Sequence, residues 1–168
     1  MGNLSKRTAI VTGGARGIGG GTARKLAADG AHVLIIDVEE SSAKKNVDTI
    51  RASGGQADFM IGDVSEENVV KEMVTLALNQ TGRLDILVQN AYGGNAHASG
   101  SAVDISPDAW DRGLGLLARS LFLGAKYAVP AMEESGNVGG SSPDDWTGAG
   151  LRHGMAPNQN VGRIVNIS

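Results

Sequence analysis

The stretch TAIVTGGARGIGGGTARKLAADG, residues 8–30, places a strand, a glycine-rich turn and a helix in immediate succession. Residues 8–13 are rich in β-branched and apolar side chains, as in a buried strand. Residues 17–30 have helical spacing and end on a glycine, a common residue at helix C-termini. Between them, the glycines of TGGARGIG (residues 12–19) let the backbone turn tightly and approach another molecule closely. This order predicts the first strand–helix unit of a parallel sheet.

The rest of the chain continues the alternation of strand-like runs and amphipathic stretches. The predicted strands lie at residues 32–38, 57–64, 83–91 and 161–168, and the last, VGRIVNIS, has the pattern of a buried strand. The predicted helices lie at residues 39–52, 66–80 and 106–134, with Ser65 and Ser106 as N-caps and Pro107 in the first turn. The pattern predicts an α/β fold with a parallel sheet and right-handed crossovers. In a doubly wound sheet of this kind the strand order would be 3-2-1-4-5. The chain is expected to be truncated after the fifth strand, which would then form an apolar edge.

Residues 135–161 interrupt this pattern. Their glycine, serine, proline and asparagine content predicts an irregular surface insertion, far longer than the usual connection of about 2–6 residues. We expect it to leave from the N-terminal edge of the sheet, whereas ligands of such sheets bind at the C-terminal edge. It is therefore interpreted as a decoration or contact surface within one domain, residues 1–168. Trp146 and His153 lie in it and receive no function.

Composition excludes several classes of function. The net charge of −3 gives no electrostatic reason to expect nucleic acid or an anionic membrane as a partner. The sequence has no cysteine, so disulfides, thiolate metal sites and cysteine nucleophiles are excluded. No signal-peptide pattern and no run of about 20 apolar residues is present, which predicts a soluble cytoplasmic protein. No metal site is expected; His32 is interpreted as structural, and His97 as a loop residue that could touch a substrate or lie in solvent.

The glycine-rich turn and a later acid together predict a dinucleotide site. A helix N-terminus that follows such a turn can hold a pyrophosphate. Asp37 ends the second predicted strand eighteen residues after Gly19, where a carboxylate can accept from both ribose hydroxyls of NAD. The same carboxylate would repel the 2′-phosphate of NADP, so NAD is favoured. Arg16 is the counter-argument, because it could face that phosphate or could simply lie in solvent.

Several motifs resemble those of the short-chain dehydrogenases/reductases, a family with a Rossmann-type fold. Thr12–Gly19 matches its T-G-x-x-x-G-x-G turn, and Asp63-Val64 resembles its adenine-contacting pair. QNAYGG, residues 89–94, resembles its N-N-A-G motif with Tyr92 in place of a glycine. The cofactor-binding set that this resemblance implies is Gly13, Arg16, Gly17, Ile18, Gly19, Asp37, Val38, Asp63, Val64, Asn90, Ala91 and Tyr92.

The resemblance also says where catalysis would be expected. The family's catalytic serine and its Tyr-x-x-x-Lys follow the fifth strand, and this chain stops at Ser168, the first serine of a pair. Neither Tyr92 nor Tyr127 has a lysine four residues later, and Leu117 stands where the family often has a catalytic asparagine. No catalytic residue is therefore assigned, and the chain alone is expected to be an inactive N-terminal portion.

Two main functions remain open. The first is an NAD(P)-dependent oxidoreductase that moves hydride between nicotinamide and an alcohol or ketone. The second is a non-catalytic dinucleotide-binding module, such as a sensor or a partner subunit; a purely structural protein would leave the turn and Asp37 unexplained. A Tyr-x-x-x-Lys encoded downstream would favour the first. By resemblance, the long helix at residues 106–134 is expected to form a homo-oligomer.

Overall fold

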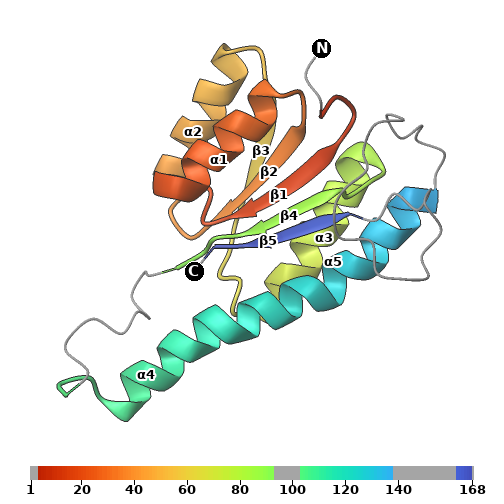
Figure 1. Ribbon diagram of the computed structural model, residues 1–168. Coiled ribbons are helices and arrows are strands. Elements are labelled where there is room, and N and C mark those ends of the chain that lie inside the picture. The colour runs from red at the N-terminus through yellow and green to blue at the C-terminus, as the bar shows by residue number, and fades with distance from the viewer. Residues whose placement is uncertain (1–3, 93–102, 138–161, 168) are drawn as a thin grey trace.

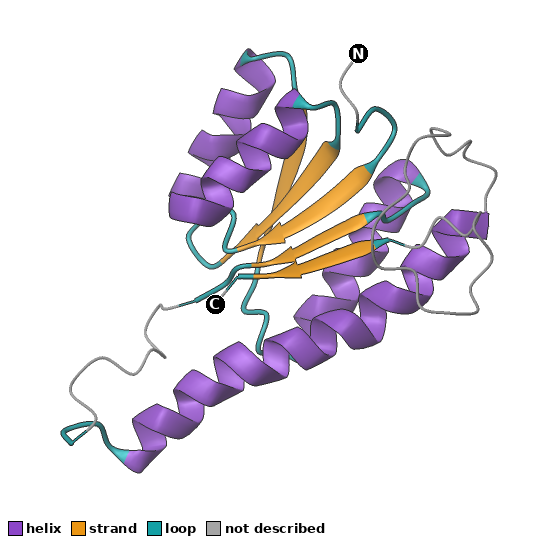
Figure 2. Ribbon diagram, viewed as in Figure 1, coloured by secondary structure: helices purple, strands orange, loops and turns teal. Residues whose placement is uncertain are grey.

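The computed structural model describes residues 4–92, 103–137 and 162–167, which form a parallel sheet with helices on both faces (Figures 1 and 2). The strands are β1 (Thr8–Thr12), β2 (His32–Asp37), β3 (Gln56–Ile61), β4 (Ile86–Gln89) and β5 (Arg163–Asn166). All neighbouring strands are parallel, and their order is β3-β2-β1-β4-β5. The predicted fold class and strand order are confirmed.

The helices divide into two layers. They are α1 (Gly17–Ala28), α2 (Glu40–Ala52), α3 (Glu67–Thr81), α4 (Pro107–Leu114), the π-helical segment η2 (Gly115–Arg119) and α5 (Ser120–Asn137). Helices α1 and α2 cover one face of the sheet, and α3 and α5 cover the other (Figure 1). No helix among the described residues is long and apolar enough to cross a bilayer.

The central strands are apolar on both faces because each face meets a helical layer. In β1, Ala9 and Val11 pack with the α1 and α2 layer, whereas Ile10 packs with the α3 and α5 layer. Successive side chains of a strand point to opposite faces, so this alternation feeds two cores at once. The sheet is therefore buried between two apolar cores. Because its strands are all parallel, their C-terminal ends lie at the same edge of the sheet.

Strand ends differ from the predicted ones. Strand β3 ends at Ile61 rather than at residue 64, because Asp63 Oδ1 accepts from the Ser65 N–H at 2.9 Å and forms a turn. The N-cap of α3 is consequently Glu66 rather than Ser65. Strand β5 is short and half-buried to exposed, and not the long buried strand predicted at residues 161–168. An edge strand has a neighbour on one side only, which explains its exposure.

The long helix predicted at residues 106–134 is confirmed at its start and extended at its end. Ser106 Oγ accepts from the Ala109 N–H at 3.3 Å, which caps α4 as predicted. The helix passes through the π turn of η2 and continues to Asn137. Residues 135–137 are therefore helical, which corrects the start of the predicted insertion; its remainder, with Trp146 and His153, lies outside the described residues, as does His97.

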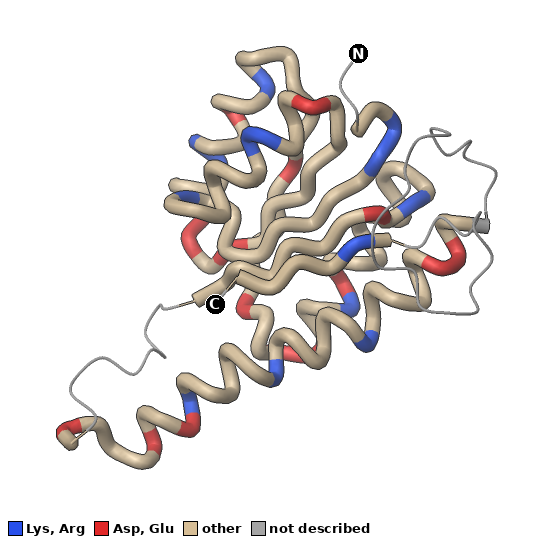
Figure 3. The backbone as a smooth tube through the Cα atoms, in the orientation of Figure 1, with Lys and Arg blue, Asp and Glu red and all other residues tan. Residues whose placement is uncertain are grey.

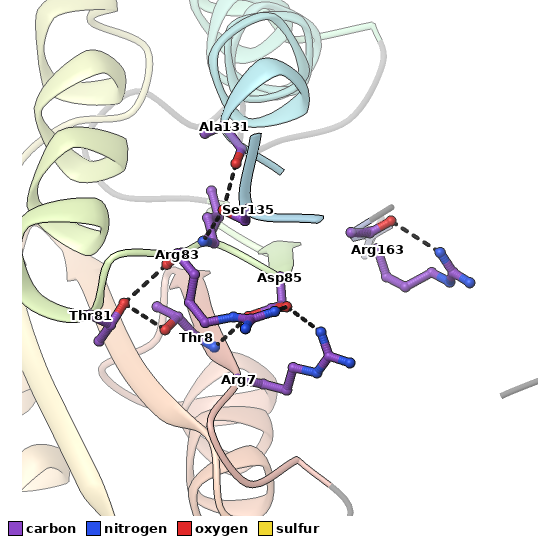
Figure 4. A network of polar contacts seen from close by, with 10 residues as sticks. Arg7, Thr8, Thr81, Arg83, Asp85, Ala131, Ser135 and Arg163 are labelled. Carbon is purple, nitrogen blue, oxygen red and sulfur yellow. Dashed lines mark hydrogen bonds and ion pairs between the residues drawn. The ribbon is translucent and has the colours of Figure 1, made fainter. Parts of the chain in front are cut away.

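Asp85 joins the strand ends at the edge opposite the glycine-rich turn (Figure 4). Its carboxylate accepts from Arg7 Nη1 at 2.7 Å, from Arg83 Nε at 2.7 Å and from the Thr8 N–H at 2.9 Å. Burial alone would raise the pKa of Asp85, but the hydrogen bonds from Arg83, Thr8 and Arg7 outweigh it and lower the pKa. This cluster holds β1 beside β4.

Candidate functional site

The glycine-rich turn after β1 has a backbone that requires glycine. Gly13 and Gly17 have φ of +63° and +57°, in the left-handed region. A Cβ on Gly19 would lie 2.2 Å from the Gly13 carbonyl oxygen, so this position excludes any larger residue. At Gly17, by contrast, nothing lies within 4 Å of where a Cβ would be. The turn is therefore tightly packed on its inner side and open at Gly17.

Two asparagine side chains hold this turn. Asn90, which follows β4, donates through Nδ2 to the Gly13 oxygen at 3.1 Å and the Thr12 oxygen at 3.3 Å. Asn46, which is buried on α2, donates through Nδ2 to the Gly14 oxygen at 2.8 Å. Arg24 Nη1 donates to Asn46 Oδ1 at 2.7 Å and fixes the orientation of this amide. The turn is thus braced from two different elements.

Asn46 was not predicted from the sequence. The signal available was a polar residue on the face of α2 that also buries Ala43, Val47 and Ile50. A polar side chain on a buried face requires hydrogen-bond partners. The sequence could not name those partners, because they belong to a different helix and turn.

Asp37 lies beside the turn, as the spacing predicted. Its Oδ2 accepts from the Ala15 N–H at 2.9 Å, and its Oδ1 accepts from the Glu39 N–H at 3.1 Å. The end of β2 is therefore tied directly to the glycine-rich segment. The Asp37 carboxylate and the glycine-rich turn therefore meet at the C-terminal edge of the sheet.

Arg16 and Glu39 form an ion pair at the same place, with 3.6 Å between Arg16 Nη1 and Glu39 Oε2. Glu39 also accepts hydrogen bonds from the hydroxyls of Ser41 and Ser42, the latter at 2.6 Å. The hydrogen bonds from Ser41 and Ser42, with a smaller contribution from Arg16, hold the pKa of Glu39 below its usual value. Glu39, which sequence reasoning did not single out, is thus a carboxylate ionised at neutral pH.

The remaining predicted cofactor-binding residues are distributed around this edge. Ala91 lies against the turn, since a Cβ on Gly13 would be 2.9 Å from its Cα. Ile18, Val38 and Tyr92 are exposed. Val64 is buried in the core, so only its backbone could face a ligand. Asp63 is exposed, and its carboxylate forms the turn to Ser65.

Leu117 lies within the π-helical segment η2. A π turn inside an α-helix often marks a functional site, and here it falls in the segment where the resemblance implied an asparagine. The Leu117 carbonyl accepts from Ser120 Oγ at 3.3 Å. Nearby, Gln89 Nε2 donates to Asn166 Oδ1 at 3.1 Å and joins the ends of β4 and β5.

Charges are interspersed over both helical layers, with acidic and basic residues close together (Figure 3). Among the described residues, no group of three or more histidine, aspartate or glutamate side chains is placed to hold a metal ion. Around the glycine-rich turn, the described residues present backbone N–H groups, the Asp37 carboxylate and the Arg16–Glu39 ion pair.

Comparison with known proteins gives the same family over most of the chain. The family model for short chain dehydrogenases matches residues 7–140. An uncharacterized oxidoreductase, YxbG of Bacillus subtilis, is 40% identical over 136 residues, which cover 81% of this chain and 49% of that protein. The 2,5-dichloro-2,5-cyclohexadiene-1,4-diol dehydrogenase LinX of Sphingobium indicum is 35% identical over 80% of this chain and 52% of its own. Cyclopentanol dehydrogenase of Comamonas testosteroni is 35% identical over 80% of this chain and 53% of its own.

Solved structures agree. A short-chain dehydrogenase/reductase structure from Burkholderia xenovorans has a TM-score of 0.74 and 31% identity, over 81% of this chain and 52% of that one. A metagenomic short-chain oxidoreductase in complex with NADP has a TM-score of 0.71 and 32% identity, over 77% and 58% of the two chains. The chain spans about half the length of the curated relatives it matches. Since the family match runs through every element from β1 to α5, this chain belongs to the short-chain dehydrogenase family.

Proposed function

We propose that this protein is an NAD(P)-dependent oxidoreductase that transfers hydride between nicotinamide and an alcohol or ketone, and that it prefers NAD to NADP. The observation that carries the proposal is the hydrogen bond between Asp37 Oδ2 and the Ala15 N–H. It places a carboxylate beside a turn whose glycines adopt left-handed backbone conformations. A dinucleotide is the ligand that uses both features, through its pyrophosphate and its ribose.

The residues fit this cofactor. The first N–H groups of α1 have no acceptor within the helix, and the space at Gly17 is open to an approaching pyrophosphate. Asn90 and Asn46 hold carbonyl oxygens of the turn, which keeps the turn in this conformation. The proposed set is Gly13, Arg16, Gly17, Ile18, Gly19, Asp37, Val38, Asp63, Val64, Asn90, Ala91 and Tyr92, with Val64 contributing backbone only.

The preference for NAD rests on charge. A ribose with free 2′- and 3′-hydroxyls can donate to Asp37, whereas a 2′-phosphate would bring like charge against it. The neighbour solved with NADP belongs to the same family, so family membership alone does not decide this preference.

Bound nicotinamide would supply the hydride acceptor or donor, and the described residues would bind and orient it. Proton transfer is not assigned to any described residue. We take residues 1–168 as one nucleotide-binding domain in which the part of residues 135–161 beyond α5 is an insertion. A secondary alcohol is the substrate class proposed, because two relatives are named for a cyclic diol and for cyclopentanol.

The first test of the proposal measures nucleotide binding, and catalytic turnover is measured afterwards. Titration of the purified chain with NADH and NADPH, followed by calorimetry, should give the tighter dissociation constant for NADH. Asp37→Asn should weaken NADH about tenfold, the size expected for losing hydrogen bonds to a charged acceptor. Asp48→Asn is the matched control, because Asp48 is an exposed acid on α2 paired with Lys44. A folded chain that binds neither nucleotide would contradict the proposal.

A non-catalytic dinucleotide-binding module is the second candidate. Leu117 favours it, since an apolar side chain in η2 cannot relay a proton where the resemblance implied an asparagine. The two functions are distinguished by following NADH formation from NAD with cyclopentanol and other secondary alcohols, in the longest product of the gene. Cofactor binding without turnover on any of them would support the second candidate.

A further inference from the structure

A second carboxylate stands beside Asp37. Glu39 is the N-cap residue of α2, and its N–H donates to Asp37 Oδ1 at 3.1 Å. Its own carboxylate is held by the hydroxyls of Ser41 and Ser42. The two acids are therefore fixed relative to one another by backbone and side-chain bonds at the start of one helix.

Arg16 faces this pair from the turn. It is the N-cap residue of α1, its side chain is 80% exposed, and its guanidinium lies 3.6 Å from Glu39 Oε2. An arginine at this position is the one group in residues 12–19 with the charge to attract a 2′-phosphate. In this structure the Arg16 guanidinium forms an ion pair with Glu39.

We infer that Glu39 is a specificity-determining residue that pairs with Arg16 and so withholds this cation from the 2′-phosphate of NADP. The inference rests on the proposed function. Glu39 acts in two ways: it neutralises Arg16, and it adds negative charge next to Asp37. NADP would have to separate the ion pair before it could use Arg16, whereas NAD requires no such change.

The ion pair is exposed, which sets the size of the effect. Exposed pairs contribute little energy and are screened by salt. Glu39→Gln should lower the ratio of the NADPH to the NADH dissociation constant about fivefold at low ionic strength. The amide oxygen of glutamine can accept from one of the two serine hydroxyls, and its NH2 group can donate to the other hydroxyl oxygen, so the start of α2 is retained.

The experiment measures both dissociation constants for the wild type, Glu39→Gln, Arg16→Ala and the double variant. The gain in NADPH affinity should require Arg16, so Glu39→Gln should have a smaller effect in the Arg16→Ala background. The gain in NADPH affinity caused by Glu39→Gln should also be smaller at high salt. Glu40→Gln is the matched control, because Glu40 is the adjacent exposed acid in the first turn of α2, and its removal should leave the ratio unchanged.

The outcomes separate the two proposals. A wild type that binds NADH, with a ratio that Glu39→Gln does not change, would overturn this inference and leave the proposed function in place. A ratio that falls equally for Glu39→Gln and Glu40→Gln would also overturn it, because the effect would then be general charge. A wild type that binds neither nucleotide would overturn both.

Discussion

At the scale of single residues, the glycine-rich turn is shaped by side-chain amides as much as by its glycines. Asn90 Nδ2 donates to the carbonyl oxygens of Thr12 and Gly13, and Asn46 Nδ2 donates to that of Gly14 and, at 3.4 Å, to that of Gly20 in the first turn of α1. Because a buried carbonyl without a donor costs about 1–3 kcal/mol, these bonds oppose other turn conformations. A fixed turn lets a ligand bind without first ordering the backbone.

Gly17 allows the binding role of the turn to be separated from its backbone strain. Gly17 and Gly82 both have positive φ, +57° and +76°, and at both positions nothing lies within 4 Å of the point that a Cβ would occupy. Gly17→Ala and Gly82→Ala should therefore each destabilise the protein by about 1–2 kcal/mol, the cost of a left-handed residue. Only Gly17→Ala should also weaken NADH binding, by at least about tenfold, since its methyl group would occupy space beside the proposed pyrophosphate.

Urea unfolding and NADH titration of the two variants make this comparison. Equal losses of stability with unequal losses of affinity are expected. Equal losses of NADH affinity would mean that Gly17 matters for folding alone.

At the scale of elements, α3 and α5 are joined by one acid. Glu67 on α3 accepts from Lys126 Nζ at 2.8 Å and from the Tyr127 hydroxyl, both on α5. Lys71 and Lys126 also lie over the Tyr127 ring, 5.3 and 5.1 Å from its centre. This cluster lies where the two helices that cover one face of the sheet meet.

Lowering the pH should weaken the contact of Glu67 on α3 with Lys126 and Tyr127 on α5 over a defined pH range. The hydrogen bonds from Lys126 and then Tyr127 lower the pKa of Glu67 from 4.5 to about 2. A carboxyl whose pKa is lower in the folded protein stabilises the fold above its unfolded pKa, and that contribution is lost as the pH falls. The free energy of unfolding of the wild type should thus exceed that of Glu67→Gln at pH 7, and the difference should shrink between about pH 4.5 and pH 2.

Chemical unfolding of both proteins across this range measures the difference directly. Glu72→Gln, an exposed acid on the same helix, is the control and should show a smaller dependence on pH. A constant difference between wild type and Glu67→Gln would show that the glutamate acts through packing instead of charge.

The strands and the site also show which features of the fold could be predicted from the sequence and which could not. The parallel sheet followed from the alternation of apolar runs and helices. Its strand order rested on the type of doubly wound fold, because the order 2-1-3-4-5 obeys the same handedness rule. Strand ends did not follow, because Asp63 and Asn90 divert the chain through side-chain bonds that the apolar pattern does not contain. The same holds at the site: Asp37 was predictable from its spacing to Gly19, whereas Asn46 and Glu39 depended on which partners the fold brings to them.

At the scale of the whole molecule, the long helix carries apolar side chains that the described residues do not cover. Trp110, Leu114, Phe122 and Val129 are each more than 40% exposed. In a regular α-helix, the eight residues from Leu114 to Phe122 would turn the second side chain about 80° away from the first. The wider π turn of η2 lies between them and reduces that rotation, so the two exposed side chains come closer to one line. Several exposed apolar residues on one helix indicate a contact surface rather than chance exposure.

We therefore expect self-association through this helix. Light scattering after gel filtration should give a wild-type mass that is a multiple of 17.2 kDa. Leu114→Asp combined with Phe122→Asp should shift it toward the monomer, because two carboxylates buried in an apolar contact cost far more than the contact contributes. Both side chains are exposed in the monomer, so its helical circular dichroism should be retained. Ile61→Asp, at an exposed position on β3 at the other edge of the sheet, is the control and should keep the wild-type mass. A monomeric wild type, or an unchanged mass for the double variant, would contradict association through this helix.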